Sequence, residues 1–270
     1  MSRLDALAAL SLLAAPLAAQ TAPPADPVPV HDTFTVASRS LGEARLINVY
    51  TPPGYHGASA SRFPVLYMPD GGINEDFPHV VRTVDSLIAL GAIRPVLVVG
   101  IPNTQRRRDL TGPTRVATDS AIAPQVGGSA AFRRFLGEEL VPAVEARYRV
   151  TDERAIVGES LAGLFVLETL LDEPALFRHY VALDPSVWWN DAAVVDSAPA
   201  RLVALAPAPR TLFLATSNVA EIAEGAARIA ALLAVLSPQG LAWQYTPRPD
   251  LTHATIFRAV GPSALASALR

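Results

Sequence analysis

The sequence predicts a three-layer α/β domain with a mostly parallel central sheet. Two segments, 63–68 and 95–101, are nearly continuous apolar runs rich in Val, Leu and Ile, which is typical of strands buried on both faces of a parallel sheet. Between them, residues 79–90 carry apolar side chains at helical spacing. Strand, helix and strand in this order form the repeating unit of parallel sheets.

Two short strands are predicted before this unit. Residues 33–36 and 45–51 are alternating segments joined by a turn at Gly42-Glu43, which indicates an antiparallel hairpin. After the unit, the amphipathic segment 129–148 and the strongly apolar segment 161–171 predict two helices.

The alternation of strands and helices continues to the end of the chain. The segments involved are predicted strands at 155–157, 180–183, 211–216 and 241–246, a helix at 221–236 and a final helix from Thr255 onward. The sequence shows no internal repeat and no second block of different composition. We therefore expect residues 31–270 to form one domain.

The composition excludes several classes of function. Half of the 270 residues are hydrophobic and the net charge is -3, which excludes a disordered chain and gives no basic excess for nucleic acid. The chain has no cysteine, so it has no disulfide, thiolate metal site or Cys nucleophile. All 22 basic residues are Arg, and without Lys neither Schiff-base chemistry nor a P-loop is available. We expect no metal and no organic cofactor.

The first 20 residues have the pattern of a secretion signal. Arg3 precedes an apolar run from Ala6 to Ala19, which is too short to cross a bilayer as a helix but suits a signal-peptide core. Residues 1–20 are predicted to be a signal peptide and residues 21–30 a Pro/Ala-rich linker. The mature protein is expected in the periplasm or outside the cell, with no membrane span after cleavage. A buried N-terminal helix is the alternative.

A serine at a predicted strand-to-helix turn carries the functional prediction. Ser160 lies in Gly158-Glu159-Ser160-Leu161-Ala162-Gly163, directly after a buried strand and before an apolar helix. This arrangement is typical of the nucleophile elbow, where small residues two positions from the serine permit a sharp turn that exposes its hydroxyl. Ala162 stands where Gly is more usual, and an ordinary Gly/Ser turn is the alternative interpretation.

A serine needs a general base to be nucleophilic at neutral pH. Of the five histidines, His253 follows the last predicted strand, where the base of such a fold arrives in chain order. Glu221 is the first choice for the carboxylate that orients it, because it is the first acid after the preceding strand. Asp184, Glu224 and Asp250 are alternatives, and a Ser–His dyad aided by a backbone carbonyl also satisfies the sequence.

Ester chemistry also needs N–H donors for the negatively charged oxygen of the intermediate. The backbone N–H of Leu161, directly after Ser160, is one predicted donor. The second is expected in the loop after the strand 63–68, where glycines let the backbone turn its N–H groups toward a ligand. Gly72 is the first choice and Gly71 the second, and a simple turn is the alternative.

These residues belong to a wider pattern that resembles the bacterial α/β-hydrolases of the esterase D group, which includes enterobactin-type siderophore esterases. The resemblance covers most of the chain from Arg45 to His253. Its blocks are Val65–Gly71, Ile101–Thr104, Arg108–Thr111, Phe132–Tyr148, Leu176–Phe177 and Asp184–Asn190. Glu159 and Ala162 depart from the family, which more often has His and Gly there. The resemblance implies an α/β-hydrolase fold and siderophore-type or aryl/acyl esters as substrates.

Candidate substrate-binding residues follow a buried strand at the sheet edge where substrate pockets of open α/β sheets form. Arg106 and Arg108 offer guanidinium groups to a carboxylate or catecholate. The alternative is a solvated loop with Arg108 paired to Asp109. Trp188 and its neighbour Trp189 are candidates for an apolar wall, with core packing as the alternative.

The sequence thus predicts an exported serine esterase with a small-molecule ester as its partner. Ser160 attacks the ester carbonyl, His253 moves the proton, and water clears the acyl-enzyme. Two other functions stay open on the sequence. One is acyl transfer to a sugar or lipid alcohol, and the other is a degenerate, non-catalytic binding module.

Overall fold

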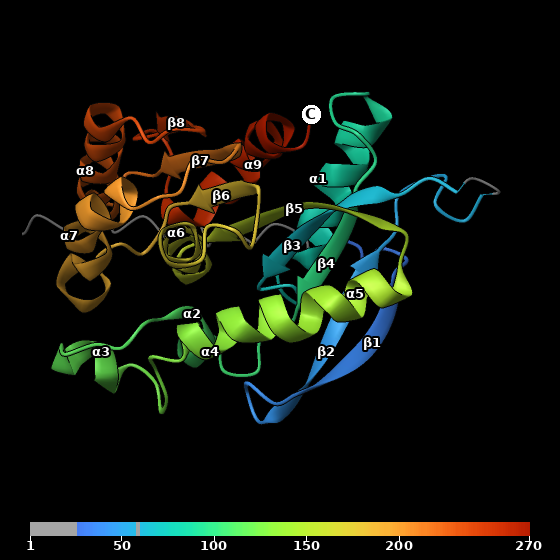
Figure 1. Cartoon of the computed structure of the whole chain (residues 1–270), viewed down its shortest axis with the longest axis horizontal. Coiled ribbons are helices and arrows are strands. Elements are labelled where there is room, and N and C mark those ends of the chain that lie inside the picture. Colours follow the sequence, from blue (N-terminus) through green and yellow to red (C-terminus); the bar gives the residue numbers. More distant parts are fainter. Residues whose placement is uncertain (1–25, 58–59) are drawn as a thin grey trace, which may run out of the picture.

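Eight strands form one sheet in the order β1-β2-β4-β3-β5-β6-β7-β8 (Figure 1). The computed structural model of the chain describes residues 26–57 and 60–270. The strands are β1 (Asp32–Ser38), β2 (Glu43–Tyr50), β3 (Phe63–Pro69), β4 (Leu97–Ile101), β5 (Val150–Glu159), β6 (His179–Leu183), β7 (Arg210–Thr216) and β8 (Leu241–Pro247). The pairs β1–β2 and β2–β4 are antiparallel and the other pairs are parallel, which confirms the predicted fold class.

Helices cover both faces of this sheet (Figure 1). They are α1 (Phe77–Ala89), α2 (Arg106–Leu110), α3 (Ala117–Ala121), α4 (Ser129–Arg134), the π-helical segment η1 (Phe135–Leu140), α5 (Val141–Arg147), α6 (Leu161–Asp172), α7 (Trp189–Val203), α8 (Ala220–Leu236) and α9 (His253–Ala268). Helices α1 and α9 pack on one face, while α6, α7, α8 and the α4–η1–α5 rod pack on the other.

The strand β3 shows why the central segments are apolar throughout. Val65 and Tyr67 belong to the core on one face of the sheet, while Leu66 and Met68 belong to the core on the other. All four side chains are almost fully buried. A strand covered on both faces has no solvent side, so the alternation of polar and apolar residues disappears.

The short helices α2 and α3 were not predicted, and two further differences lie in α7 and α9. Helix α7 was not predicted, because Asn190, Asp191 and Ala192 have left-handed backbone angles and Pro199 interrupts the helical pattern. Helix α9 begins at His253, two residues earlier than predicted, where Thr252 and Thr255 form a capping box. His253 therefore lies on the first turn of a helix and not on a free loop.

The predicted signal peptide, residues 1–20, and residues 21–25 of the predicted linker lie outside the described residues. Asp26, in the described part of that linker, contacts two helices. The Asp26 carboxylate lies 2.6 Å from Arg258 on α9 and 3.1 Å from Arg82 on α1. Within residues 26–57 and 60–270, the structure has no helix with the length and apolarity required for a membrane span.

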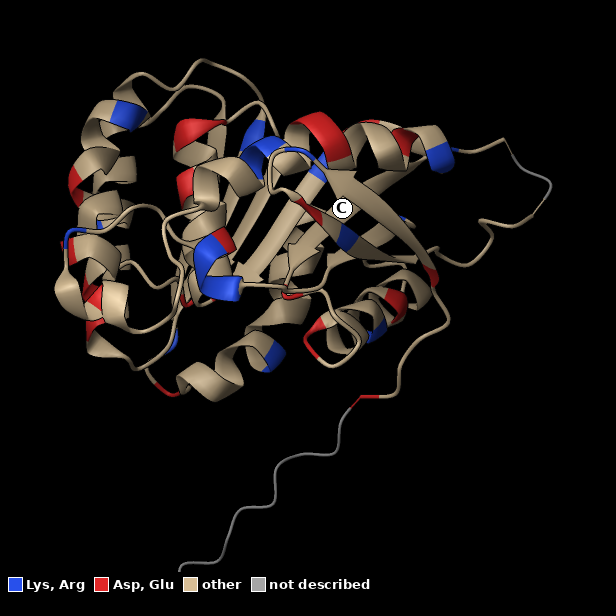
Figure 2. Ribbon diagram, turned by 90° about the horizontal axis from the view of Figure 1, so that it is seen from below, with Lys and Arg blue, Asp and Glu red and all other residues tan. Residues whose placement is uncertain are grey.

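Charged residues of both signs are interspersed along the helices and loops (Figure 2), while the strands β3 and β4 carry none. The most deeply buried ion pair joins Arg45 of β2 to Asp109 of α2 at 2.6 Å. Both side chains are 1% exposed. A buried charge needs a partner of opposite charge, and each of these residues provides it for the other. This pair fixes α2 against the antiparallel part of the sheet.

The parallel strands align the residues that follow them. Glu159 at the end of β5 is in register with Leu183 at the end of β6, and Leu183 is in register with Ala215 of β7. The residues just beyond these strands therefore lie side by side at one edge of the sheet. Substrate sites of open parallel sheets form at this carboxyl edge.

Candidate active site

Ser160 occupies the predicted sharp turn between β5 and α6. Its φ of 60° and ψ of -122° lie outside the regions that L-residues prefer, which costs roughly 1–3 kcal/mol. Backbone hydrogen bonds hold the turn: Ser160 N–H donates to Leu183 O at 3.0 Å, and Ser186 N–H donates to Ser160 O at 3.0 Å. The chain thus fixes the strained serine from both sides.

Two glycines make the turn possible. A Cβ on Gly158 would lie 2.7 Å from the Cβ of Ala162, which no real pair of carbons tolerates. A Cβ on Gly163 would lie 2.8 Å from Leu183 O, so Gly163 allows α6 to pack against the loop after β6. Ala162 itself is fully buried and fits. The departure from the usual Gly at this position leaves the elbow intact.

His253 is paired with Asp184, which follows β6. The His253 Nδ1 atom lies 2.6 Å from Asp184 Oδ2, and the side chains are 42% and 0% exposed. Ser217, which follows β7, donates its backbone N–H to Asp184 Oδ1 at 2.7 Å and its hydroxyl to Oδ2 at 2.6 Å. A buried carboxylate is stable only with such donors. The pairing uses Nδ1 and leaves Nε2 of His253 as the nitrogen that can act as a base.

The pairing shifts the pKa of both groups. The hydrogen bond to Asp184 raises the pKa of His253 above its usual value, since it outweighs the opposing effect of burial. Burial alone would raise the pKa of Asp184, but the hydrogen bonds from His253 and Ser217 outweigh it and lower that pKa. A negatively charged Asp184 and a proton-accepting His253 are the states that base catalysis requires.

The prediction that Glu221 orients His253 is corrected by this geometry. Glu221 lies on the exposed side of the first turn of α8, as a solvated residue favoured by the helix dipole. Glu224 is also exposed on α8, and Asp250 forms an exposed ion pair with Arg248 at 2.6 Å. Asp184, an alternative in the sequence analysis, is the carboxylate that contacts the histidine.

A carboxylate next to the serine had no predicted role. Burial raises the pKa of Glu159 to about 7, and the charge of His253 opposes this rise. Burial also raises the pKa of Asp76, to about 6, and the neighbouring Asp70 adds to that effect. The sequence shows that Glu159 lies at the end of a buried strand. Its electrostatic effect on the pKa of His253 could be found only from the structure.

The loop after β3 holds the predicted second oxyanion donor. Gly72 N–H donates to Glu75 Oε2 at 2.7 Å, while Gly71 N–H donates to Ile101 O at 3.1 Å within the sheet edge. The N–H of Gly71 is therefore used by a backbone hydrogen bond of the fold. The N–H of Gly72 bonds the side chain of Glu75, which a ligand oxygen could replace. Leu161 begins α6, and the N–H of a first helical residue has no acceptor within its helix.

The predicted substrate-binding arginines have different environments. Arg106 makes a two-point ion pair with Asp70, with Nε–Oδ1 and Nη2–Oδ2 distances of 2.7 Å, and it affects the pKa of His253 through its charge. Arg108 donates from Nε to Asp109 and from both terminal nitrogens to Glu43. The prediction that Arg108 binds substrate is corrected, because all its nitrogens serve the ion-pair network that fixes α2.

The two tryptophans also differ. Trp189 is buried and donates its ring N–H to Gly112 O at 2.9 Å, so it is a packing residue. Trp188 is partly buried against the core, with its ring centroid 6.1 Å from that of Trp189. Its place two residues after Ser186 keeps it near the loop that contacts Ser160.

Sequence reasoning missed Ser186. Its hydroxyl oxygen lies 3.4 Å from Ser160 Oγ, and its side chain is buried. The only signal in the sequence was its place in the family-like block Asp184–Asn190, directly after the acid. No sequence pattern places one loop serine beside another.

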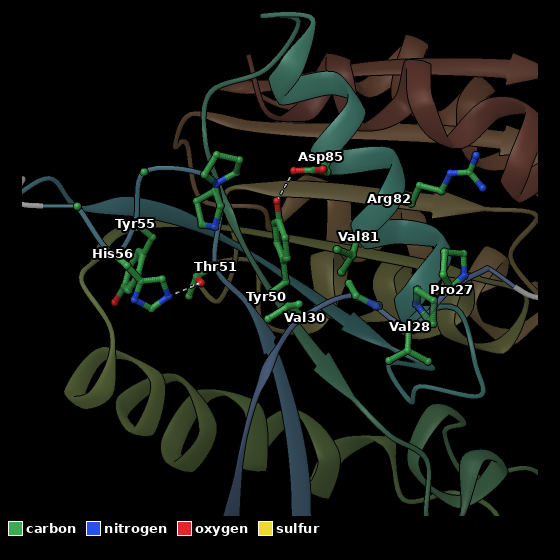
Figure 3. A pocket seen from close by; sticks show the side chains of 16 residues that line it. Pro27, Val28, Val30, Tyr50, Thr51, Tyr55, His56, Val81, Arg82 and Asp85 are labelled. Carbon is green, nitrogen blue, oxygen red and sulfur yellow. Dashed lines mark hydrogen bonds between the residues drawn. The ribbon is translucent and has the colours of Figure 1, made fainter.

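A cavity of about 630 Å³ lies elsewhere, between β2, α1 and the segment 26–30 (Figure 3). Tyr50 points across it and donates its hydroxyl to Asp85 Oδ1 at 2.5 Å. Its lining includes neither Ser160 nor His253, so it is separate from the chemistry described above. In the described part of the chain, no group of three or more His, Asp or Glu side chains is arranged to hold a metal ion.

The elbow serine and the Asp184–His253 pair at the carboxyl edge of a parallel sheet define a serine hydrolase of the α/β-hydrolase fold. Residues 38–224 match the Esterase family, and the chain belongs to it. It is 29% identical over 241 residues to the ferri-bacillibactin esterase BesA of Bacillus subtilis, covering 81% of each chain. It is 28% identical over 255 residues to the apo-salmochelin esterase of Escherichia coli, covering 84% of this chain and 76% of the relative.

A solved structure agrees with these relatives. An IroE-like serine hydrolase from Shewanella oneidensis superimposes with a TM-score of 0.80 at 27% identity, covering 88% of this chain and 79% of that one. The α/β-hydrolase fold and the resemblance to siderophore esterases are thereby confirmed. The chain is a carboxylic-ester hydrolase.

Proposed function

We propose that this protein is an exported serine esterase that cleaves siderophore-type esters through an acyl-enzyme, with Ser160, His253 and Asp184 as its catalytic triad. The observation that carries the proposal is the buried Asp184 carboxylate 2.6 Å from His253 Nδ1, directly after Leu183, whose carbonyl accepts the N–H of the strained Ser160 at 3.0 Å. A buried acid, a partly exposed histidine and a partly buried serine at the sheet edge match the roles of orienting group, base and nucleophile.

The first half of the reaction forms the acyl-enzyme. Ser160 Oγ attacks the ester carbonyl carbon while His253 Nε2 takes the hydroxyl proton. The imidazolium that forms is stabilised by Asp184, which keeps its negative charge. The bond to the alcohol then breaks, and His253 returns the proton to the leaving alcohol oxygen.

The second half releases the acid. His253 takes a proton from water, whose oxygen attacks the acyl carbon, and then gives the proton to Ser160 Oγ as it leaves. In both halves the carbonyl oxygen gains negative charge, which backbone N–H groups must stabilise. We assign this role to Leu161 and Gly72, where the substrate oxygen would replace Glu75 Oε2 on the Gly72 N–H.

The substrate class rests on the relatives. Their names state esterase activity on ferri-bacillibactin and on apo-salmochelin, and they cover most of this chain. Arg106, held by Asp70 but electrostatically coupled to His253, is the basic side chain that supports recognition of an anionic substrate group. Trp188 is proposed to contribute apolar contact surface at the same edge.

Export rests on the sequence. The apolar run in residues 1–20 has the length of a signal-peptide core, and a cleaved signal would release the domain to the periplasm or beyond. Fractionation of cells that produce the full chain tests this step. Retention of uncleaved protein in the cytoplasm would contradict it.

Hydrolysis of a set of esters by the purified domain tests the function. The set contains a nitrophenyl ester and tri-ester and linear catecholate siderophores, each measured with wild type and with Ser160→Ala. We expect siderophore hydrolysis that Ser160→Ala abolishes. Transfer of the acyl group to an added alcohol in place of water would favour an acyltransferase, and a folded wild type without any turnover would favour a binding module.

A further inference from the structure

We propose that Ser186 positions the nucleophile: its hydroxyl donates a hydrogen bond to Ser160 Oγ and supports this oxygen each time it carries developing negative charge. The inference rests on the proposed function and adds a fourth side chain to the triad. It assigns the loop after β6 two tasks, since the same loop supplies Asp184.

The two serine hydroxyls lie within hydrogen-bond distance of each other. Ser186 Oγ lies 3.4 Å from Ser160 Oγ, and Ser186 is 2% exposed. Across residues 26–57 and 60–270, each of these hydroxyls is the other's hydrogen-bond partner. Buried hydroxyls normally have a hydrogen-bond partner, and the partner of the Ser186 hydroxyl is Ser160 Oγ, the proposed attacking atom. We therefore look for its role in the reaction and not in the fold.

The backbone fixes this geometry independently of the Ser186 side chain. Ser186 N–H donates to Ser160 O at 3.0 Å, and Ser160 N–H donates to Leu183 O at 3.0 Å. Pro185 restricts the chain between Asp184 and Ser186. Replacing Ser186 by Ala therefore keeps the bond that shapes the loop and removes only the hydroxyl.

Either hydroxyl can donate in this contact, and the reaction selects the donor. When His253 takes the Ser160 proton, Ser160 Oγ has lone pairs that can accept the Ser186 hydroxyl proton in a hydrogen bond. No proton is transferred along this bond, so Ser186 stays neutral throughout. The same bond stabilises Ser160 Oγ when it leaves during deacylation, so it acts on both halves of the reaction and has little effect on substrate binding.

Kinetics of Ser186→Ala test the inference. We expect kcat for a nitrophenyl ester and the rate of fluorophosphonate labelling each to fall about 3- to 10-fold, the effect of one hydrogen bond, with KM unchanged. Ser186→Thr keeps a hydroxyl and should recover most of the loss. Ser197→Ala is the matched control, because its hydroxyl bonds Ala193 O on α7 at 2.7 Å and has no contact with Ser160.

The outcomes separate this inference from the function on which it rests. If wild type is active and Ser186→Ala is equally fast or faster, or lowers kcat only in proportion to its folded fraction, the inference is wrong and the triad stands. If wild type neither turns over nor labels, the proposed function fails and takes the inference with it. A thermal unfolding curve for each variant gives the folded fraction at the assay temperature.

Discussion

The loops after β6 and β7 lie side by side, yet they contribute different chemistry. The loop after β6 supplies Asp184, the carboxylate that contacts His253, and Ser186, which contacts Ser160. The loop after β7 supplies Ser217, whose N–H and hydroxyl both bind that carboxylate. The acid of this fold often follows the strand before the last, which is β7 here. In this protein the loop after β7 instead carries the hydrogen-bond donors to the acid. The comparison shows that one strand end supplies the acid and the neighbouring strand end supplies the hydrogen bonds that stabilise its buried charge.

The largest effect should follow from removing the acid itself. Asp184→Ala leaves His253 without its orienting partner, and we expect kcat for ester hydrolysis to fall about 10³- to 10⁴-fold. Glu221→Ala, the matched change in the segment after β7, should leave the rate unchanged because Glu221 is a solvated residue. Both variants are measured on a nitrophenyl ester. A larger loss in the Glu221 variant than in the Asp184 variant would contradict the assignment of Asp184 as the acid.

A smaller effect is expected from the supporting loop. Ser217→Ala removes one of three hydrogen bonds to Asp184 and keeps those from the Ser217 backbone N–H and His253, so we expect about a 10-fold loss in kcat. With one donor fewer, the pKa of Asp184 rises. As pH is lowered, the variant should therefore lose activity at a higher pH than wild type does. A full kcat/KM profile against pH checks this, and a loss as large as that of Asp184→Ala would mean that Ser217 does more than hold the acid.

The smallest change in rate concerns Glu159, on the neighbouring strand β5. A negative charge near His253 stabilises the imidazolium and so raises its pKa. Glu159→Gln removes that charge, so the pKa of His253 should fall and the acid limb of kcat/KM should move to lower pH. Because burial raises the pKa of Glu159 to about 7, its charge grows as pH rises through neutrality. A limb that stays in place or moves to higher pH contradicts the coupling.

The sequence predicted the fold well wherever burial alone determines the pattern. The continuous apolar segments at β3 and β4 are possible only for strands covered on both faces, and both were predicted close to their observed bounds. Helix α7 was missed because its first turn has left-handed backbone angles and Pro199 lies inside it. Those features are stabilised by tertiary contacts, such as Asp119 Oδ2 accepting from Asn190 N–H at 2.8 Å, that no local pattern reveals.

The site residues also differ in how far the sequence could predict them. Ser160 has a local signature, a small-residue turn between strand and helix, and His253 has a position in chain order. Asp184 follows a strand as Glu221 does, and the choice between the two depends on how the end of β6 meets the start of α9. Arg108 was misassigned because its partner Glu43 lies on a distant strand, 65 residues away in the sequence.

Mass spectrometry of the protein quenched during turnover of a slow nitrophenyl ester shows whether Ser160 is the nucleophile. We expect one acyl group on the peptide that contains Ser160, and its absence in Ser160→Ala and in His253→Ala quenched at the same time. Ester hydrolysis at an undiminished rate by Ser160→Ala, or an acyl group found on another residue of the wild type, would contradict it.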